Sequence, residues 1–426
     1  MALNLLSTTT RVEVPFINVE IGGYSFGIYD KQTKSITDNE GYSKKIIASY
    51  PNYIKSLSIN KINGAVNTYN VNMDYAIRGG DDPNFLEKVF SKASSDRKIT
   101  LSYGDLASPT FIFKKETAIM SDVRSSFSFE GSKISYNIAC TSDAISLTAG
   151  TYFFPRRNEK PSKVLTEILY DNRYGLLDVF YGMRDRELVE ARGLIATDDK
   201  KVVIEAQSNI SVLDYMSYLI SCMTSLTSTD NKSLLSGNKY IISVFDSTTG
   251  EFGGPYFKVQ KVARSISDIN SIDTYTIDIG YPSPNNVVSF TIDNNQQYSI
   301  LYDYSQKIEQ SEYNYRINDN GAIEYIYSPL ISRQSMFYKT TEADKTWWTR
   351  VTQYPITAKL TIKGLLRPAL LMTYLKINTI FYGRKHISSG TYIITAQNDA
   401  VDESGYRTTL SLTRIAGEEA WFWKVL

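Results

Sequence analysis

The C-terminal part of the chain, from Tyr354 onward, alternates apolar and polar residues in four successive runs. Because successive side chains of a β-strand point to opposite faces, such alternation buries one face and leaves the other free. The expected strands cover residues 356–362, 375–381, 391–395 and 406–412, and the turns between them include Gly364, Gly383, Gly390 and Gly405. These runs carry no residues of catalytic chemistry, so this region is expected to form a structural wall.

The composition agrees with a protein dominated by β-sheet. The 426 residues include 32 Tyr and 18 Phe but only 21% charged residues, and aromatic and β-branched residues favour half-buried pleated surfaces. A chain of this length can bury substantial hydrophobic cores. The 46 basic and 45 acidic residues give a formal charge of +1, whereas a protein that wraps nucleic acid is normally far more basic.

The N-terminal part also reads as β-structure. The dipeptide Asn63-Gly64 separates two alternating runs and predicts a hairpin between a strand that ends near Ile62 and a long strand over residues 65–77. Asp82 and Pro83 are typical of a helix start, here over residues 83–91. Further strands are expected at residues 98–103, 109–119, 124–130 and 133–141.

A change of pattern divides the chain into three parts. Residues 161–169 and 211–220 have helical spacing, the second with Ser211 or Asn209 as a cap, and the β pattern returns at Lys239. The expected fold is therefore mainly β with a helical insertion. The expected domains are residues 1–150, a helix-containing module at 151–236, and a second β domain at 237–426 that is interrupted by a polar excursion at about 294–350.

The cysteines and the apolar segments bear on the compartment. Cys140 and Cys222 lie far apart and are expected to be buried free thiols, which fits folding in a reducing cytoplasm. The N-terminus lacks a convincing signal peptide, and no segment reaches the roughly twenty apolar residues of a membrane helix. The protein is expected to be soluble, made inside a cell and not bound to a membrane.

The sequence favours a protein without catalytic activity or cofactor. His386 is the single histidine and follows a turn, where a loop histidine is the expected interpretation, and no spacing of His, Cys or acidic residues indicates a metal site. A glycosidase needs two carboxylates across a cleft, and the 45 acidic residues do not exclude one. A carbohydrate-binding or carbohydrate-cleaving protein therefore stays open as the alternative function.

Several segments together resemble the central baseplate hub of phage tails and related contractile injection systems. They are Gly280-Tyr281-Pro282 with residues 287–290 and 294–304, residues 388–394 leading to 405–414, Gly80 to Asn84 before the helix, and residues 102–105. The resemblance covers most of the chain. Each motif alone is moderately specific.

The resemblance implies a trimeric structural hub in the virion, assembled in the host cytoplasm. Each chain of such a hub contributes two tube-like β-barrel domains plus smaller α+β modules, so that three chains form a pseudo-sixfold ring. One end of the ring continues the tail tube, the other holds the central spike among further baseplate proteins, and the lumen passes the tape measure protein and then, transiently, DNA. A tail tube or adaptor protein is a third possibility, for which a single barrel in a shorter chain is expected.

Two expectations follow for the interfaces. Loops at the ends of long strands are expected to form contacts between subunits, including Asn63, Gly64 and the tryptophans Trp347 and Trp348. No convincing alignment relates residues 13–141 to residues 237–414, so the two-barrel expectation rests on the resemblance.

Overall fold

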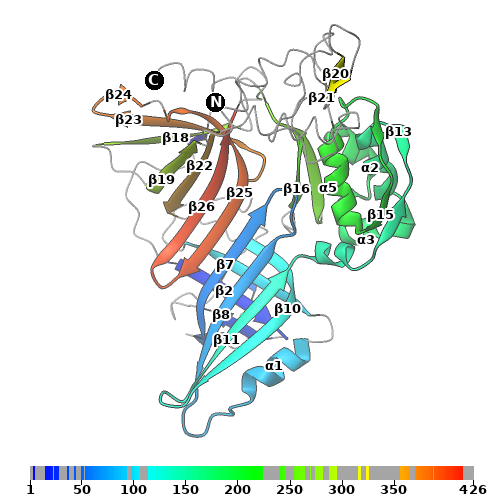
Figure 1. Ribbon diagram of the computed structural model, residues 1–426. Coiled ribbons are helices and arrows are strands. Elements are labelled where there is room, and N and C mark those ends of the chain that lie inside the picture. Colours follow the sequence, from blue (N-terminus) through cyan, green and yellow to red (C-terminus); the bar gives the residue numbers. More distant parts are fainter. Residues whose placement is uncertain are drawn as a thin grey trace.

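The structure is a computed structural model, and its described residues leave several gaps. They are 3–4, 15–22, 24–27, 36–37, 43–44, 49–51, 53–93, 97–105, 114–223, 240–245, 254–263, 269, 274–281, 287–294, 315–317, 323–325, 356–363, 370–386 and 388–415. The expected fold class is confirmed, because the chain is mainly β with a small helical part (Figure 1).

A continuous 16-stranded sheet forms most of the molecule. Its first group of strands comes from the N-terminal part: β2 (Pro15–Ile21), β3 (Tyr24–Gly27), β6 (Ser49–Pro51), β7 (Ile54–Ile62), β8 (Thr68–Ala76), β9 (Lys98–Asp105), β10 (Lys114–Ser128) and β11 (Lys133–Thr141). Its second group, apart from one short strand, comes from the C-terminal part: β1 (Leu3–Asn4), β18 (Thr274–Tyr281), β19 (Val287–Asn294), β22 (Ile356–Lys363), β23 (Tyr374–Phe381), β24 (Arg384–Lys385), β25 (Gly390–Asp402) and β26 (Gly405–Arg414).

Strand β25 joins the two groups. Its first residues pair with β23, from Gly390 opposite Ile377 to Ile393 opposite Tyr374. Its last residues, 396–402, pair instead with β7. Since β26 runs along the other edge of β25, the long strand belongs to both groups and makes the two parts of the sheet continuous.

Three hydrophobic cores lie beside this sheet. The first is enclosed by the N-terminal strands and α1 (Phe85–Ala93), but it also takes Val401 and Tyr406 from the β25–β26 hairpin. The second core lies within the C-terminal strands, around residues such as Leu360 and Leu412. The third belongs to the helical module. The N-terminal and C-terminal strands therefore enclose separate cores, and the β25–β26 hairpin contributes to both.

The helical module lies beside the sheet, on the right in Figure 1. Its elements are η1 (Asp143–Thr148), β12 (Tyr152–Phe154), β13 (Arg157–Glu159), α2 (Pro161–Leu169), η2 (Asn172–Tyr174), α3 (Leu176–Val179), η3 (Tyr181–Met183), α4 (Arg186–Ala191), β14 (Val202–Ile204), β15 (Gln207–Ile210) and α5 (Val212–Cys222). The hairpin of β16 (Tyr240–Phe245) and β17 (Tyr256–Lys261) contributes to the same core. Two further small hairpins are β4 (Ile36–Thr37) with β5 (Ser43–Lys44) and β20 (Tyr315–Ile317) with β21 (Ile323–Tyr325).

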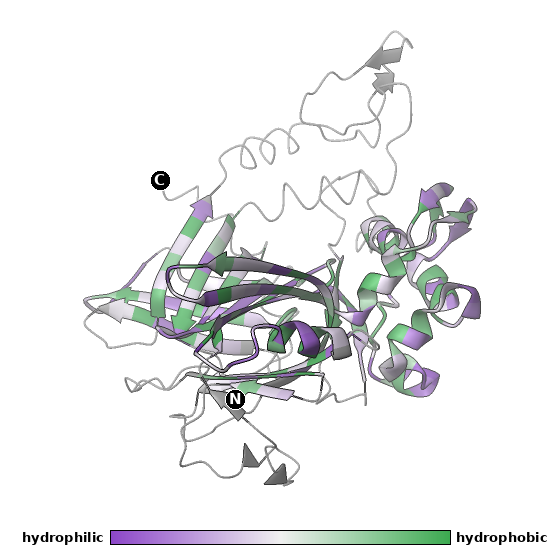
Figure 2. Ribbon diagram, turned by 90° about the horizontal axis from the view of Figure 1, so that it is seen from below, coloured by the Kyte–Doolittle hydropathy of each residue, from purple (hydrophilic) through white to green (hydrophobic). Residues whose placement is uncertain are grey.

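The local signals of the sequence explain several of these elements. Ser211 caps α5 through a hydrogen bond that its hydroxyl accepts from the Asp214 N–H, as expected. Both cysteines are buried and free, as expected. In Figure 2, hydrophobic and hydrophilic residues interleave along the strands and around the helices, which matches elements with one face in a core. Within the described residues, no helix has both the length and the apolar character to cross a membrane.

Several expected boundaries are wrong. The strand expected at 391–395 continues to Asp402 as β25, because its second half pairs with β7. The strands expected at 109–119 and 124–130 are one strand, β10, because a β-bulge at Ser121 absorbs the irregular polar stretch without breaking the pairing with β11. The strand after the Asn63-Gly64 hairpin starts at Thr68 rather than at residue 65. Helix α1 starts at Phe85, two residues late, because Asp82 accepts a hydrogen bond from the Asn84 N–H in the turn before it.

Candidate assembly site

The two groups of strands contain a repeated unit, although their sequences do not align convincingly. In the first unit the neighbour order is β7–β8–β11–β10–β9–β2, and in the second it is β19–β22–β26–β25–β23–β18. Each strand has its counterpart at the same place in the order. The units differ at one end, where β2 and β9 pair antiparallel but β18 and β23 pair parallel.

The β-bulges show that the correspondence extends to single residues. Strand β10 has one extra residue, Ser121, opposite β11, and its counterpart β25 has one, Thr395, opposite β26. Strand β7 has the extra residue Lys55 opposite β8, and its counterpart β19 has Val288 opposite β22. Since bulges are defined, local insertions in a ladder, two matching pairs of them fix the register of one unit on the other.

Side-chain contacts repeat at corresponding places. Asn137 on β11 donates through Nδ2 to Oδ1 of Asn72 on β8 at 2.7 Å. At the equivalent place in the second unit, the hydroxyls of Thr361 on β22 and Thr409 on β26 are hydrogen-bonded at 3.1 Å. Both cross-strand pairs are polar.

A weak signal of this repeat is present in the sequence. With the bulges superimposed, residues 54–60 (IKSLSIN) fall on residues 287–293 (VVSFTID), which have the same alternation and similar side chains at most positions. The match is too short to stand out in a single sequence.

The junction of the two units is a strand pairing inside the chain. The β7 edge of the first unit meets the part of β25 after its bulge, from Ala396 opposite Ile62 to Asp402 opposite Ser56. Near the end of this ladder, Lys55 and Glu403 form an exposed ion pair with 3.0 Å between Nζ and Oε1. The junction therefore uses an edge of each unit, as when separate chains join by strand addition.

Two of the expected interface residues lie at this junction. The Asn63 N–H donates to the Thr395 carbonyl oxygen at 3.0 Å, and the Gly64 N–H donates to the Ile242 carbonyl oxygen at 2.8 Å. The hydroxyl of Ser243 donates to Oδ1 of Asn63. Asn63 and Gly64 thus connect both units and the helical module within one chain, and their role between chains stays a prediction. Trp347 and Trp348 lie outside the described residues.

A buried polar cluster fixes the junction from the inside. Glu116 on β10 accepts hydrogen bonds from Lys61 Nζ at 2.6 Å and from the Tyr103 hydroxyl at 2.8 Å. Asp399 on β25 accepts from the Tyr406 hydroxyl at 2.9 Å, and also from Thr408 and Gln397. The first set of bonds lies within the first unit and the second within the second unit, and the two sets meet where the rings of Tyr103 and Tyr406 pack edge-on with centroids 6.1 Å apart.

The electrostatics of this cluster favour structure over reactivity. Burial, followed by the nearby charge of Glu116, raises the pKa of Tyr103 well above its usual value. Burial and the charge of Asp399 do the same to the pKa of Tyr406. Both phenols therefore stay neutral and act as fixed hydrogen-bond donors to the two carboxylates.

The sheet face opposite the cores is polar and runs across the junction. In each strand the residues between the buried ones point to this face. Most have short uncharged side chains: Ser56, Ser58, Asn60, Asn70, Asn72, Ser135, Asn137, Asn398, Ala400, Thr409 and Ser411. The face also carries charged side chains. Lys133 pairs with Asp74 at 2.5 Å and Arg124 with Asp122 at 2.8 Å, and Lys359, Lys363 and Arg407 lie on the same face of the second unit.

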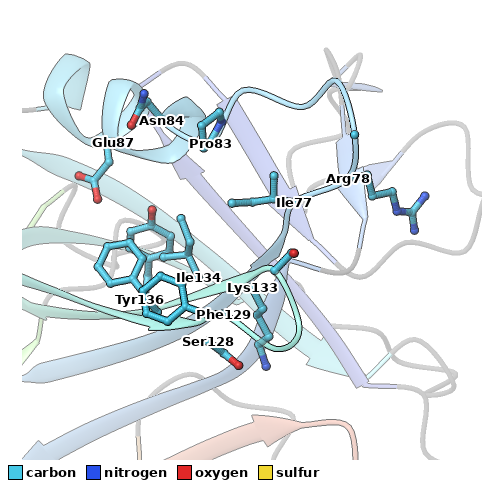
Figure 3. A pocket seen from close by; sticks show the side chains of 13 residues that line it. Ile77, Arg78, Pro83, Asn84, Glu87, Ser128, Phe129, Lys133, Ile134 and Tyr136 are labelled. Carbon is cyan, nitrogen blue, oxygen red and sulfur yellow. The ribbon is translucent and has the colours of Figure 1, made fainter.

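The described hollows do not present a pair of opposed carboxylates. A groove of about 550 Å³ lies between the start of α1 and the β10–β11 hairpin, with Glu87 as its single acidic side chain (Figure 3). A second hollow of about 430 Å³ on the helical module has Glu190 as its single acid. The carbohydrate-cleaving alternative needs two acids across a cleft, so these hollows give it no support.

The histidine lies away from these hollows. His386 is exposed, and its Nδ1 lies 2.8 Å from the Ser388 hydroxyl. Across the residues described in the structure, no group of three His, Cys, Asp or Glu side chains is placed to hold a metal ion.

Comparisons with known proteins give structural neighbours but no sequence relative. Neither a scan against protein-family models nor a search of curated proteins finds a match. Among solved structures, the chain is similar to the 43 kDa tail protein of prophage MuSo2 from Shewanella oneidensis, with 10% identity, a TM-score of 0.47, and coverage of 95% of this chain and 98% of that one.

Two more neighbours are of the same kind. A tail protein from Neisseria meningitidis has 8% identity and a TM-score of 0.45, covering 95% of this chain and 99% of that one. The E. coli c3393 protein, a component of the type VI secretion system with structural similarity to T4 tail proteins, has 8% identity and a TM-score of 0.44, covering 94% and 77%. The structural neighbours are thus phage tail proteins and a related secretion component. At these identities and TM-scores, the function has to be inferred from the residues of this chain itself.

Proposed function

We propose that this chain is a structural hub subunit of a phage tail or related injection apparatus, and that three copies form a ring of six strand units around an open channel. The observation that carries the proposal is the repeated unit, with its two copies joined edge to edge through β7 and β25. A head-to-tail contact of this kind generates a ring when its rotation closes. Three chains of two units give the pseudo-sixfold symmetry that the sequence resemblance implies.

The polar face suits the wall of such a channel. Most of its side chains are Ser, Thr and Asn, which present hydrogen-bonding groups, and its basic side chains are few and interspersed with acidic ones such as Asp74 and Asp122. Proteins bind DNA mainly through Lys and Arg contacts to phosphates. A wall of this composition therefore has low affinity for DNA and lets it pass. The β7–β25 ladder and the edge-on packing of Tyr103 on Tyr406 hold the two units of each chain together.

The partners follow from the same proposal. One end of the ring would continue the tail tube and the other would hold the central spike and further baseplate proteins, with the tape measure protein and then DNA inside. The domain division at residues 150 and 236 belongs to the proposal too, with the two strand units as the tube-like domains and the helical module on the outside, and with the β16–β17 hairpin of the second domain packed into the core of that module. The site of action is the virion tail, and the role is not enzymatic.

Electron microscopy tests the proposal directly. We expect class averages of the purified full chain to show a ring with a central hole and six similar lobes. A protein that shows only single compact particles at high concentration would contradict the proposal. Release of reducing sugars from host glycans, lost on Glu87→Gln or Glu190→Gln substitution, would support the carbohydrate alternative instead.

A further inference from the structure

The pairing inside the chain is a template for pairing between chains. Each unit has one long strand that continues beyond a bulge, β10 or β25, and one edge strand with its own bulge, β7 or β19. Inside the chain, the edge strand of the first unit pairs with the long strand of the second. The corresponding strands β10 of the first unit and β19 of the second unit take no part in this pairing.

These two strands each have an edge that is open in the described part of the molecule. Beyond its bulge, β10 pairs with β11 along one edge, and no described strand lies along the other, whereas its first residues pair with β9. Strand β19 pairs with β22 along one edge, and its second edge also meets no described strand. Open strand edges are templates for strand addition, and natural proteins usually protect them.

We propose that β19 of one copy pairs antiparallel with residues 122–128 of β10 in a second copy of this chain, in the register of β7 on β25. This inference deepens the proposed function, because it names the contact that closes the ring. When the bulges are matched, Asn398 corresponds to Arg124 and Asn60 to Asp293. The template pair Asn398–Asn60 therefore predicts the pair Arg124–Asp293 between two copies. In the same way, Ala400–Ser58 becomes Ser126–Thr291, and Val401–Leu57 becomes Phe127–Phe290.

Charge supports this register. The transferred pairing places Arg124 directly opposite Asp293, and directly opposed unlike charges stabilise a strand pair. Both side chains are exposed in the single chain. Arg124 contacts Asp122 of its own strand at 2.8 Å, with four-fifths of its side chain exposed, so it can also contact a neighbour.

Apolar side chains support the same register. In the template, Val401 and Leu57 lie opposite each other and are each 1% exposed. Their counterpart Phe127 is 59% exposed and Phe290 is only partly buried, as expected for a pair whose second half is supplied by another copy. Such aromatic cross-strand pairs contribute to sheet pairing.

The next contact is an ion pair in the template, but its predicted counterpart between two copies is apolar. The ion pair of Lys55 with Glu403 corresponds to Val288 with Phe129, which are 53% and 89% exposed. Large side chains this exposed mark contact surfaces when they gather in one place, and here they fall on the two edges that the template brings together.

Disulfide trapping tests the register. The variant Ser126→Cys with Thr291→Cys places thiols on directly opposed residues, at a separation that a disulfide spans. The two native cysteines are buried, and burial raises the pKa of Cys140 to about 12, so they do not compete. The matched control is Asp122→Cys with Thr291→Cys, four residues out of register.

We expect oxidised Ser126→Cys/Thr291→Cys protein to run as covalent dimers and trimers on a non-reducing gel, with at least tenfold more cross-linked product than the control. Mixing the two single variants should give dimers and nothing larger. A ring seen by microscopy together with no cross-link, or with equal cross-linking in the control, would overturn the register but leave the proposed ring. Absence of any association would overturn both.

Charge reversal gives an independent test without cysteines. Arg124→Asp or Asp293→Arg alone should weaken association by about tenfold or more in low salt, because like charges then face each other across the edge. The double variant Arg124→Asp/Asp293→Arg should restore most of the association. Single variants that associate as the parent does, or a double variant weaker than both, would contradict the Arg124–Asp293 contact.

Discussion

Lys61 Nζ lies 2.6 Å from Glu116 Oε1, and the two side chains are 6% and 0% exposed. Lys61 comes from β7, the edge strand at the junction, and Glu116 from β10, across the interior of the first unit. The pair is held further by the Tyr103 hydroxyl, which donates to the same carboxylate oxygen. A buried ion pair of this kind gives little net stability against apolar residues of the same shape, but it is costly to break.

Removing one partner of this pair should therefore destabilise the fold strongly. Lys61→Met leaves the Glu116 carboxylate buried without its counter-ion, and we expect the free energy of unfolding to fall by about 3–5 kcal/mol in urea titrations. The matched control is Lys55→Met, which removes the exposed pair with Glu403 and should cost no more than about 1 kcal/mol. Equal effects of both substitutions would show that Glu116 is not held as described.

The second carboxylate of the cluster gives a smaller effect. Tyr406→Phe keeps the ring, which packs edge-on against Tyr103 at a centroid distance of 6.1 Å, but removes the hydroxyl that donates to Asp399. Because Asp399 keeps its bonds from Thr408 and Gln397, we expect a loss of about 1–3 kcal/mol in the same titration. An unchanged midpoint would mean that this hydroxyl contributes nothing to the junction.

Stability should fall at alkaline pH through buried tyrosines of the helical module. Burial raises the pKa of Tyr215 to about 12, whereas an unfolded chain releases this proton near pH 10. Between these values the unfolded state binds fewer protons than the folded state, so the free energy of unfolding decreases as pH rises, by up to about 1.4 kcal/mol per pH unit for this group.

Tyr215→Phe isolates that contribution. The substitution keeps the stacking on Phe154, whose ring centroid lies 3.7 Å away, and removes the titrating hydroxyl. The difference in urea midpoint between the variant and the parent should therefore be constant below about pH 9 and should shift in favour of the variant from about pH 10 upward. Parallel pH profiles would contradict a raised pKa at this position.

Most side chains of the polar face are uncharged, and this composition predicts weak affinity for DNA. The double variant Asn72→Lys/Asn137→Lys adds two cations per chain at neighbouring positions of this face. We expect it to retain double-stranded DNA in a filter-binding assay at about 50 mM salt, with strong salt dependence, whereas the parent does not. Glu187→Lys, exposed on α4, changes the net charge equally and should leave DNA unbound.

Much of the fold was predictable because alternation and helix capping depend on residues that are close in the sequence. The four C-terminal runs, the Asn63-Gly64 hairpin and the helix that Ser211 caps are present. The length of β10 was not predictable, because the bulge at Ser121 is tolerated only through pairing with β11, a contact between separate parts of the sequence.

Most of the assembly site could not be predicted from the sequence. The main evidence for the site is that the bulges of β7 and β19 match, as do those of β10 and β25. A bulge is defined by which residues pair between strands, and a single sequence does not contain that information. In the sequence, the exposed Phe127 and Phe129 do not differ from aromatic residues of a buried strand face, because core and contact faces use the same side chains. The sequence predicts a turn and a contact at Asn63 and Gly64, and the structure places them at the junction within the chain.

Native mass spectrometry of the purified full chain at tens of micromolar tests the central claim most directly, since the mass reports the number of strand units in the assembly. We predict a dominant species of three copies of the 48.2 kDa chain, whose population at a given low-salt concentration falls when Arg124→Asp is introduced. A monomer at every concentration, or a dimer insensitive to that substitution, would contradict the account.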